Sequence, residues 1–274
     1  MLININKEEI LNKIEADEND IVFLAGSLVE GECSSANVGM GNLYSDVDVF
    51  ILKNYEQYIT KEAEYDFAGK KIFFFKDNNY GYDVEVYPIQ DIESVVASIR
   101  EASIEVGERV SNSIQLTNGW GLDDVNDFLS RYFYSIPIKN EEKYAGLVYK
   151  DDLEKFRKIY KYYLINKIDG MIEDICGNIL AGQMETALLL ARGCSLELMK
   201  TIIYDNGEMC SRDKWVWLKF KNIVKNKDKY NKIFKCLYTL MFEKIEESEA
   251  KTFIERYLRL QESTIENNYI GVDF

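Results

Sequence analysis

Two aspartates at the start of an apolar segment limit what this part of the chain can form. Asp46 and Asp48 are separated by one valine, and the apolar run continues to residue 52. Residues 47–52 therefore predict a buried strand, and because side chains alternate across a strand, both carboxylates emerge on one face. Two like charges this close repel each other, and burying them without a partner is costly. A divalent cation resolves this conflict, and Mg²⁺ is the expected ion because it binds carboxylate and phosphate oxygens.

A second apolar segment, residues 21–25, ends in the pair Gly26-Ser27. This pattern predicts a buried strand, a small turn and then a helix that begins near Ser27. Glycine lets the backbone approach a ligand closely, and the free N–H groups at a helix N-terminus accept phosphate. The two segments together indicate a site for a metal-bound nucleotide.

Two further carboxylates occur on a later predicted strand. Residues 82–88 alternate between apolar and polar side chains, which places Asp83 and Glu85 on the same face. Pro88 ends this strand. Residues 71–75 predict a neighbouring strand, and residues 77–81 have the composition of a hairpin turn between the two.

The residue pattern changes after about residue 115. Before it, helices are predicted over residues 7–15, 55–64 and 92–104. After it, strands are hard to identify, and the periodicity predicts helices over residues 153–175, 179–192, 196–204, 214–224, 230–246 and 250–266, with Gly177, Gly182, Gly193 and Gly207 near their ends. We therefore expect an α+β fold, with a mixed β-sheet and flanking helices in a domain of residues 1–117 and a helical bundle in a domain of residues 118–274.

Composition excludes several classes of function. The 274 residues contain no histidine, and the five cysteines are scattered without a Cys-x-x-Cys pair. Ordinary zinc sites, Ser-His triads and Cys-His dyads are therefore excluded, and reduced structural thiols are expected. The net charge of −14 argues against nucleic-acid binding and suits a cationic small molecule. Because no signal-peptide pattern and no apolar stretch of membrane-spanning length occur, we expect a cytoplasmic protein without membrane contact.

The ordered combination of these motifs resembles the nucleotidyltransferase superfamily that includes DNA polymerase β, and specifically the bacterial antibiotic nucleotidyltransferases. The segments that carry the resemblance are Ala25-Gly26-Ser27-Leu28-Val29-Glu30-Gly31, Tyr44-Ser45-Asp46-Val47-Asp48-Val49-Phe50 and Asp83-Val84-Glu85-Val86. They cover about the first 90 to 100 residues, and the helical remainder is similar only in architecture. Eighteen residues separate Ser27 from Asp46, several more than the family usually has, so residues 32–42 are interpreted as an insertion.

The resemblance implies a Mg²⁺-dependent enzyme that transfers NMP, by default AMP from ATP, to a hydroxyl of a small molecule and releases pyrophosphate. Aminoglycosides and lincosamides are the acceptors by analogy, which implies antibiotic resistance. Asp46, Asp48 and Glu85 would be the catalytic residues and would hold two Mg²⁺ ions, with Asp83 as the fallback for Glu85. The residues expected to bind the nucleotide are Gly26, Ser27, Ser45 and Lys214. The alternative for Lys214 is a solvent-exposed lysine at the start of a helix.

Several alternatives stay open at this point. The same chemistry fits a protein or tRNA acceptor, as in toxin-antitoxin or signalling enzymes, although the charge of −14 weighs against tRNA. It also fits a biosynthetic enzyme with a small acceptor. A sugar transferase that uses Asp46 and Asp48 leaves Gly26-Ser27 unexplained, and a module with a degraded site conflicts with the presence of all the family carboxylates. Whether the protein forms a homodimer stays open as well.

Overall fold

The computed structural model describes residues 7–33, 45–67, 69–76, 81–103, 114, 116, 119–225 and 227–269. The chain divides into two compact units. The first contains Met1–Ser103 and Asn112–Phe156, and the second contains Ile104–Ser111 and Arg157–Phe274. The first is built on a sheet and the second on helices, so the predicted α+β fold is confirmed.

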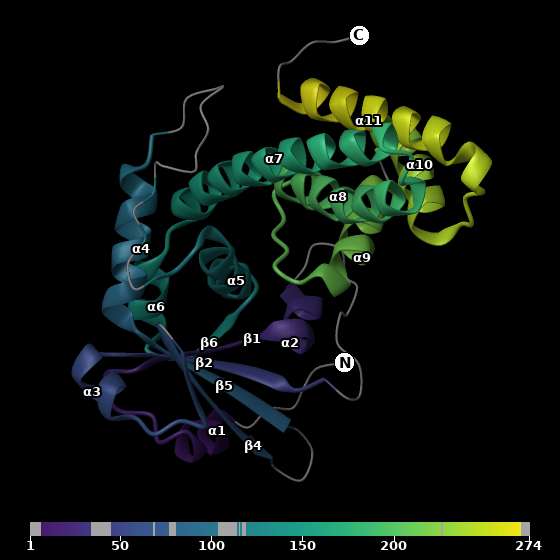
Figure 1. Cartoon of the computed structure of the whole chain (residues 1–274). Helices are drawn as coiled ribbons and strands as arrows, with labels where there is room; N and C mark the ends of the chain where they lie inside the picture. Colours follow the sequence, from purple (N-terminus) through teal and green to yellow (C-terminus); the bar gives the residue numbers. More distant parts are fainter. Residues whose placement is uncertain are drawn as a thin grey trace. The chain divides into compact units, whose positions relative to one another are not determined.

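The first unit is organised around a mixed sheet, which has six strands in the described part of the chain (Figure 1). The strand order is β3-β4-β5-β2-β1-β6. β2 and β5 are parallel, and the other neighbouring pairs are antiparallel. The strands are β1 (Ile21–Ala25), β2 (Val47–Lys53), β3 (Tyr65–Phe67), β4 (Lys70–Lys76), β5 (Gly81–Pro88) and β6 (Ile136–Lys139).

One face of this sheet is apolar and is covered by helices. Ile10, Val29 and Tyr58 come from these helices and are buried in one cluster with alternate residues of the strands, among them Val22, Leu24, Val47, Val49, Ile51, Val84 and Val86. Because residues i and i+2 share a face, the remaining side chains of β2 and β5 point to the opposite face. The helices are α1 (Lys7–Lys13), α2 (Gly26–Cys33) and α3 (Tyr55–Thr60).

A row of aromatic rings occupies part of the opposite face. Tyr87, Phe50 and Phe23 come from three neighbouring strands, and their ring centroids are 6.2 Å and 5.1 Å apart. Phe128 packs edge-on against the outer rings, at 5.2 Å from Tyr87 and 6.2 Å from Phe23. Burial of such large rings stabilises the fold strongly and fixes a helix over this end of the sheet. The helices on this side include α5 (Leu122–Phe133), which carries Phe128, and α6 (Glu141–Leu147); α4 (Ile89–Glu101) follows directly after β5.

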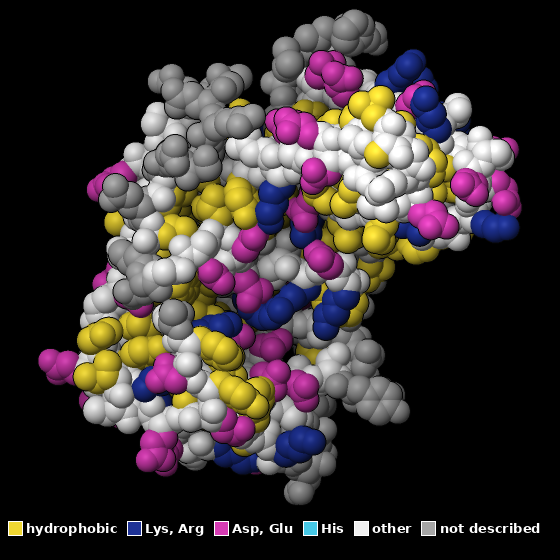
Figure 2. Space-filling view, in the orientation of Figure 1, with side chains coloured by type: hydrophobic (Ala, Val, Ile, Leu, Met, Phe, Trp, Pro, Cys, Tyr) yellow, Lys and Arg dark blue, Asp and Glu magenta, His cyan; other side chains and the backbone are white. Residues whose placement is uncertain are grey.

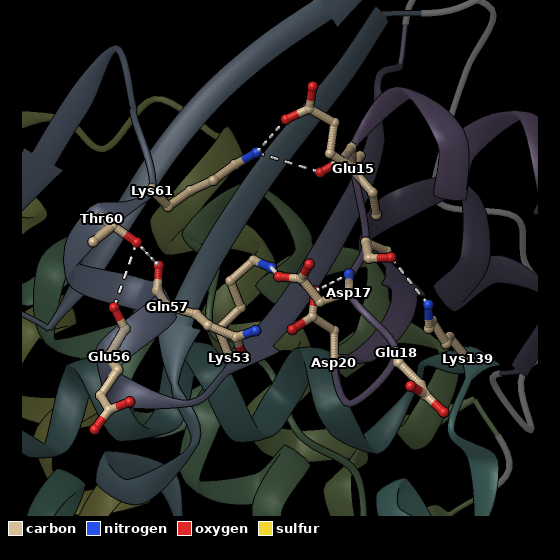
Figure 3. Close-up of polar contacts among 12 residues, drawn as sticks. Glu15, Asp17, Glu18, Asp20, Lys53, Glu56, Gln57, Thr60, Lys61 and Lys139 are labelled. Atoms are coloured by element: carbon tan, nitrogen blue, oxygen red, sulfur yellow. Dashed lines mark hydrogen bonds and ion pairs between the residues drawn. The ribbon is translucent and has the colours of Figure 1, made fainter.

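An ion cluster around the buried side chain of Lys53 joins the end of β2 to the loop before β1 (Figure 3). Lys53 is 2% exposed, and its Nζ lies 2.5 Å from Oδ2 of Asp20 and 2.7 Å from Oδ2 of Asp17. Lys139 of β6 donates a hydrogen bond of 3.1 Å to the carbonyl oxygen of Ala16 in the same loop. These contacts tie together three strands that are distant in sequence.

The region after residue 118 is not entirely helical, and this part of the prediction was wrong. β6 pairs with β1 as the edge strand of the sheet, so the first compact unit extends to Phe156 rather than ending at residue 117. β6 has only four residues and contains Pro137, which an edge strand tolerates because one side needs no N–H donor. So short a segment carries no readable alternation. The three-residue strand β3 escaped prediction for the same reason.

The second unit has an apolar core formed by long helices. The sequence predicted the helices but divided two of them wrongly, because Gly177 and Gly193 lie inside helices. A Cβ on Gly193 would approach Cε of Met171 to 3.2 Å, so this glycine allows close helix packing. No described helix combines the length and apolar character needed to cross a membrane. The helices are α7 (Lys150–Leu180, which starts in the first unit), α8 (Met184–Asp205), α9 (Asp213–Val224), α10 (Asn231–Phe242) and α11 (Glu247–Tyr269).

Candidate functional site

The parallel pairing of β2 with β5 brings the predicted carboxylates together. Asp48 and Asp83 are direct partners in this pair, so their side chains leave neighbouring strands on the same face. Asp46 lies one residue before β2 and is exposed. We call this side of the sheet the carboxylate face, and we call Asp46, Asp48 and Asp83 the acid trio. The ring row and α5 cover the other end of the same face.

Two glycines make room for the acid trio. Gly26 has a φ of +81°, and a Cβ built on it would lie 1.5 Å from Oδ2 of Asp48. A Cβ on Gly81 would lie 2.2 Å from Oδ1 of Asp46. Any larger residue would displace one of these carboxylates. The sequence predicted a role for Gly26, whereas Gly81 was placed only in a turn, although it directly precedes the alternating strand.

The carboxylates of this face influence one another electrostatically. Burial, followed by the nearby negative charges of Asp46 and Glu85, raises the pKa of Asp83, and Arg131 acts in the opposite direction. Negative charge is therefore concentrated around Asp83. A bound cation would relieve this repulsion.

Glu85 lies deeper in the same face and is already neutralised by protein groups. Its side chain is 10% exposed. Oε2 accepts hydrogen bonds from Nζ of Lys70 at 2.9 Å and from the hydroxyl of Tyr87 at 2.5 Å. Oε1 lies 3.7 Å from Nη2 of Arg131. Burial, reinforced by the Glu85 charge, raises the pKa of Tyr87 well above its ordinary value, so this hydroxyl stays a donor.

Sequence reasoning missed three partners of Glu85, which are Lys70, Tyr87 and, on α5, Arg131. The guanidinium of Arg131 lies 5.4 Å from the centre of the Phe50 ring and also pairs with Asp127, one helical turn earlier. Burial opposes its positive charge, but Glu85 and Asp127 together hold the pKa of Arg131 above its ordinary value. The i,i+4 spacing of Asp127 and Arg131 was the only signal in the sequence, and such pairs are common on exposed helices.

The other predicted site residues have more ordinary surroundings. Ser27 is half-buried in the first turn of α2, and Ser45 is half-buried just before Asp46. Lys214 belongs to α9 of the second unit, where its Nζ lies 5.2 Å from the centre of the Trp215 ring. Residues 34–42 of the predicted insertion lie outside the described residues. The expected nucleotide contacts of these residues stay predictions.

The carboxylates of the acid trio are suitable ligands for a hard cation, although they do not form a complete coordination shell by themselves. In the described part of the chain, no three acidic or cysteine side chains are already gathered as around a bound ion. Mg²⁺ does not require such a cage, because it usually takes one or two carboxylates together with substrate phosphates and retains several waters. The acid trio and a triphosphate together offer this type of ligand set.

No family model matches the chain, and no curated protein matches it either. A solved structure of a nucleotidyltransferase-like protein from Exiguobacterium sibiricum 255-15 does match, with 10% sequence identity and a TM-score of 0.47. The match covers 96% of this chain and 75% of that one. Similarity at this level leaves the function undecided, so a functional assignment has to come from the carboxylate face itself.

Proposed function

We propose that the first unit binds a nucleoside triphosphate with Mg²⁺ on the carboxylate face and transfers its nucleotidyl group to a hydroxyl of a small molecule, with release of pyrophosphate. The observation that carries this proposal is the pairing of Asp48 with Asp83 on parallel strands, with Asp46 beside them and Gly26 against Asp48. This arrangement concentrates carboxylates beside a glycine turn and the start of a helix, which suits the handling of phosphate groups.

Each residue of the face has a role in this reaction. Asp46, Asp48 and Asp83 would hold the ion, which when bound neutralises the charge that develops on the phosphate oxygens. Gly26 leaves space for the Asp48 carboxylate and exposes the backbone N–H groups at the start of α2 to phosphate. Ser27, in the first turn of that helix, has a hydroxyl that can donate a further hydrogen bond.

Asp83 is a better candidate than Glu85 for the third carboxylate. Asp83 faces Asp48 directly and is half-buried, and burial, followed by neighbouring negative charges, raises the pKa of Asp83. The Glu85 carboxylate accepts hydrogen bonds from Lys70 and Tyr87, and these bonds would have to break before it could ligate a metal. We therefore assign Glu85 the role of anchoring Arg131 and Lys70 beneath the acid trio.

The acceptor class follows from charge and analogy. A net charge of −14 favours a cationic acceptor such as an aminoglycoside over tRNA. ATP is the proposed donor, and antibiotic modification is the proposed role.

The proposal is tested by transfer of label from α-³²P-ATP to a panel of aminoglycosides and lincosamides in the presence of Mg²⁺. Asp48→Asn should reduce the rate by at least about a hundredfold, because electrostatic groups of this kind are worth about 10²–10³ in rate. Asp66→Asn is the matched control, since Asp66 is exposed on the opposite face of the same sheet and should leave the rate unchanged. Full activity of Asp48→Asn would refute the proposal, and comparison of Asp83→Asn with Glu85→Gln tests the choice of third carboxylate.

A further inference from the structure

Three large aromatic side chains lie exposed on the outer strands of the sheet. Tyr65 and Phe67 of β3 are 53% and 52% exposed, and Phe74 of β4 is 43% exposed. The rings of Tyr65 and Phe67 are parallel within 10°, with centroids 6.2 Å apart, and Phe74 meets Tyr65 edge-on at 6.0 Å. We call these three residues the aromatic platform.

The strand register places the aromatic platform on the carboxylate face. Phe74 is the direct partner of Asp83 in the pairing of β4 with β5. Tyr65 is the partner of Ile72, which in turn is the partner of Glu85. Cross-strand partners share a face, so the exposed rings continue the same surface as the acid trio. The apolar side of β4 is separate, because Phe73 and Phe75 pack into the cluster on the other face.

Exposed rings in a cluster call for an explanation that isolated exposed residues do not. Each leaves about half of its surface in water, although the neighbouring apolar face could have buried large rings. Nothing in the folding of β3 and β4 requires three aromatics on the solvated side, where polar residues are usual. In Figure 2, apolar and acidic side chains lie next to each other over the sheet of the first unit.

We propose that the aromatic platform stacks against the base of the nucleoside triphosphate whose phosphates are held at the acid trio. This inference rests on the proposed function. Tyr65 on β3 lies two strand spacings from β5 and is offset from Asp83 by two residues along the strands, so the two backbones are about 12 Å apart, which is comparable to the separation of base and phosphates in a nucleotide. Aromatic stacking is tolerant of base identity because every base has a π face, so ATP and GTP should bind with similar affinity.

The test compares two probes, ATP and inorganic tripolyphosphate, each titrated with Mg²⁺ by isothermal calorimetry. The double variant Tyr65→Ala/Phe74→Ala should bind ATP about 5- to 150-fold more weakly, because one stacked base is worth that much in affinity. Its affinity for tripolyphosphate, which has no base, should be unchanged. Tyr55→Ala is the matched control, since Tyr55 is equally exposed, at 53%, on α3 over the other face.

Conservative variants separate stacking from a structural role. Phe74→Trp keeps a π face and should retain ATP affinity, whereas Phe74→Leu keeps apolar bulk and should lose it. Unchanged ATP affinity in the double variant overturns the inference, and loss of binding of both probes in Asp48→Asn then shows that the proposed function survives. Equal weakening of ATP and tripolyphosphate in the double variant also overturns it. Selective loss of aminoglycoside binding in the double variant also overturns the inference, because the aromatic platform then binds the acceptor.

Discussion

Replacement of Gly26 by alanine is the sharpest test of how the backbone positions Asp48. The new Cβ would lie 1.5 Å from Oδ2, 2.5 Å from Cγ and 3.0 Å from Cβ of Asp48, all shorter than ordinary van der Waals contact. The Asp48 side chain must therefore leave its position. Gly26 also has a φ of +81°, a region in which alanine is strained by about 1–2 kcal/mol.

A matched variant isolates the clash from the backbone strain. Gly182 follows α7 with a φ of +76°, and a Cβ there would meet no atom within 4 Å. Gly182→Ala should therefore lose only the roughly 1–2 kcal/mol of backbone strain. Gly26→Ala should lose about 0.5–1.5 kcal/mol more, the energy needed to hold Asp48 in an unfavourable rotamer. Unfolding in urea, followed by circular dichroism, gives both values.

The functional consequence of the clash is larger than the loss of stability. With Asp48 displaced, Gly26→Ala should lose Mg²⁺-dependent nucleotidyl transfer to nearly the same extent as Asp48→Asn, while Gly182→Ala should retain it. The reasoning fails if Gly26→Ala destabilises the protein no more than Gly182→Ala does. It also fails if Gly26→Ala transfers nucleotide at the native rate.

Two further predictions concern ion pairs of the first unit. Asp20→Asn removes the buried partner of Lys53 and should destabilise the protein by about 3–5 kcal/mol. Asp17→Asn changes a half-exposed carboxylate and should destabilise the protein by less than about 1 kcal/mol. Equal losses of stability for the two variants in thermal unfolding would contradict this prediction. Burial opposes the charge of Asp152, but the hydrogen bonds from Arg100 and a backbone N–H outweigh it and lower the pKa of this carboxyl. The contribution of Asp152 to stability is therefore present above about pH 4 and is lost as the pH falls through the lowered folded-state pKa. Asp152→Asn should therefore make the fall of the melting temperature at acid pH shallower.

The sequence by itself determined the local part of the site. Asp46 and Asp48 share a face because strand geometry has a period of two, and no tertiary contact is needed to know this. The glycine at position 26 signals a turn, and its φ of +81° is consistent with that. The helical character of the second unit was identifiable from the spacing of apolar residues, whereas the ends of α7 and α8 were not, because Gly177 and Gly193 lie inside these helices. The α+β class followed from these patterns.

Tertiary structure decided which groups meet across the sheet. The period of β5 places Asp83 and Glu85 on one face, so alternation cannot choose between them. The choice comes from the register with β2, which puts Asp83 beside Asp48 and Phe50 beside Glu85. Register depends on non-local packing, here on the row of rings and on the burial of Arg131 against Glu85, and these involve residues from distant parts of the sequence.

The same reason explains the aromatic platform and strand β6. Tyr65 and Phe74 are nine residues apart and become neighbours only when β3 folds back onto β4. β6 is recognisable only through its pairing with β1, more than a hundred residues earlier in the chain. The sequence specified which chemical groups are available along each strand, and the pairing of the strands decided which of them form a site, because side-chain proximity across a sheet is set by hydrogen-bond register and not by the local pattern.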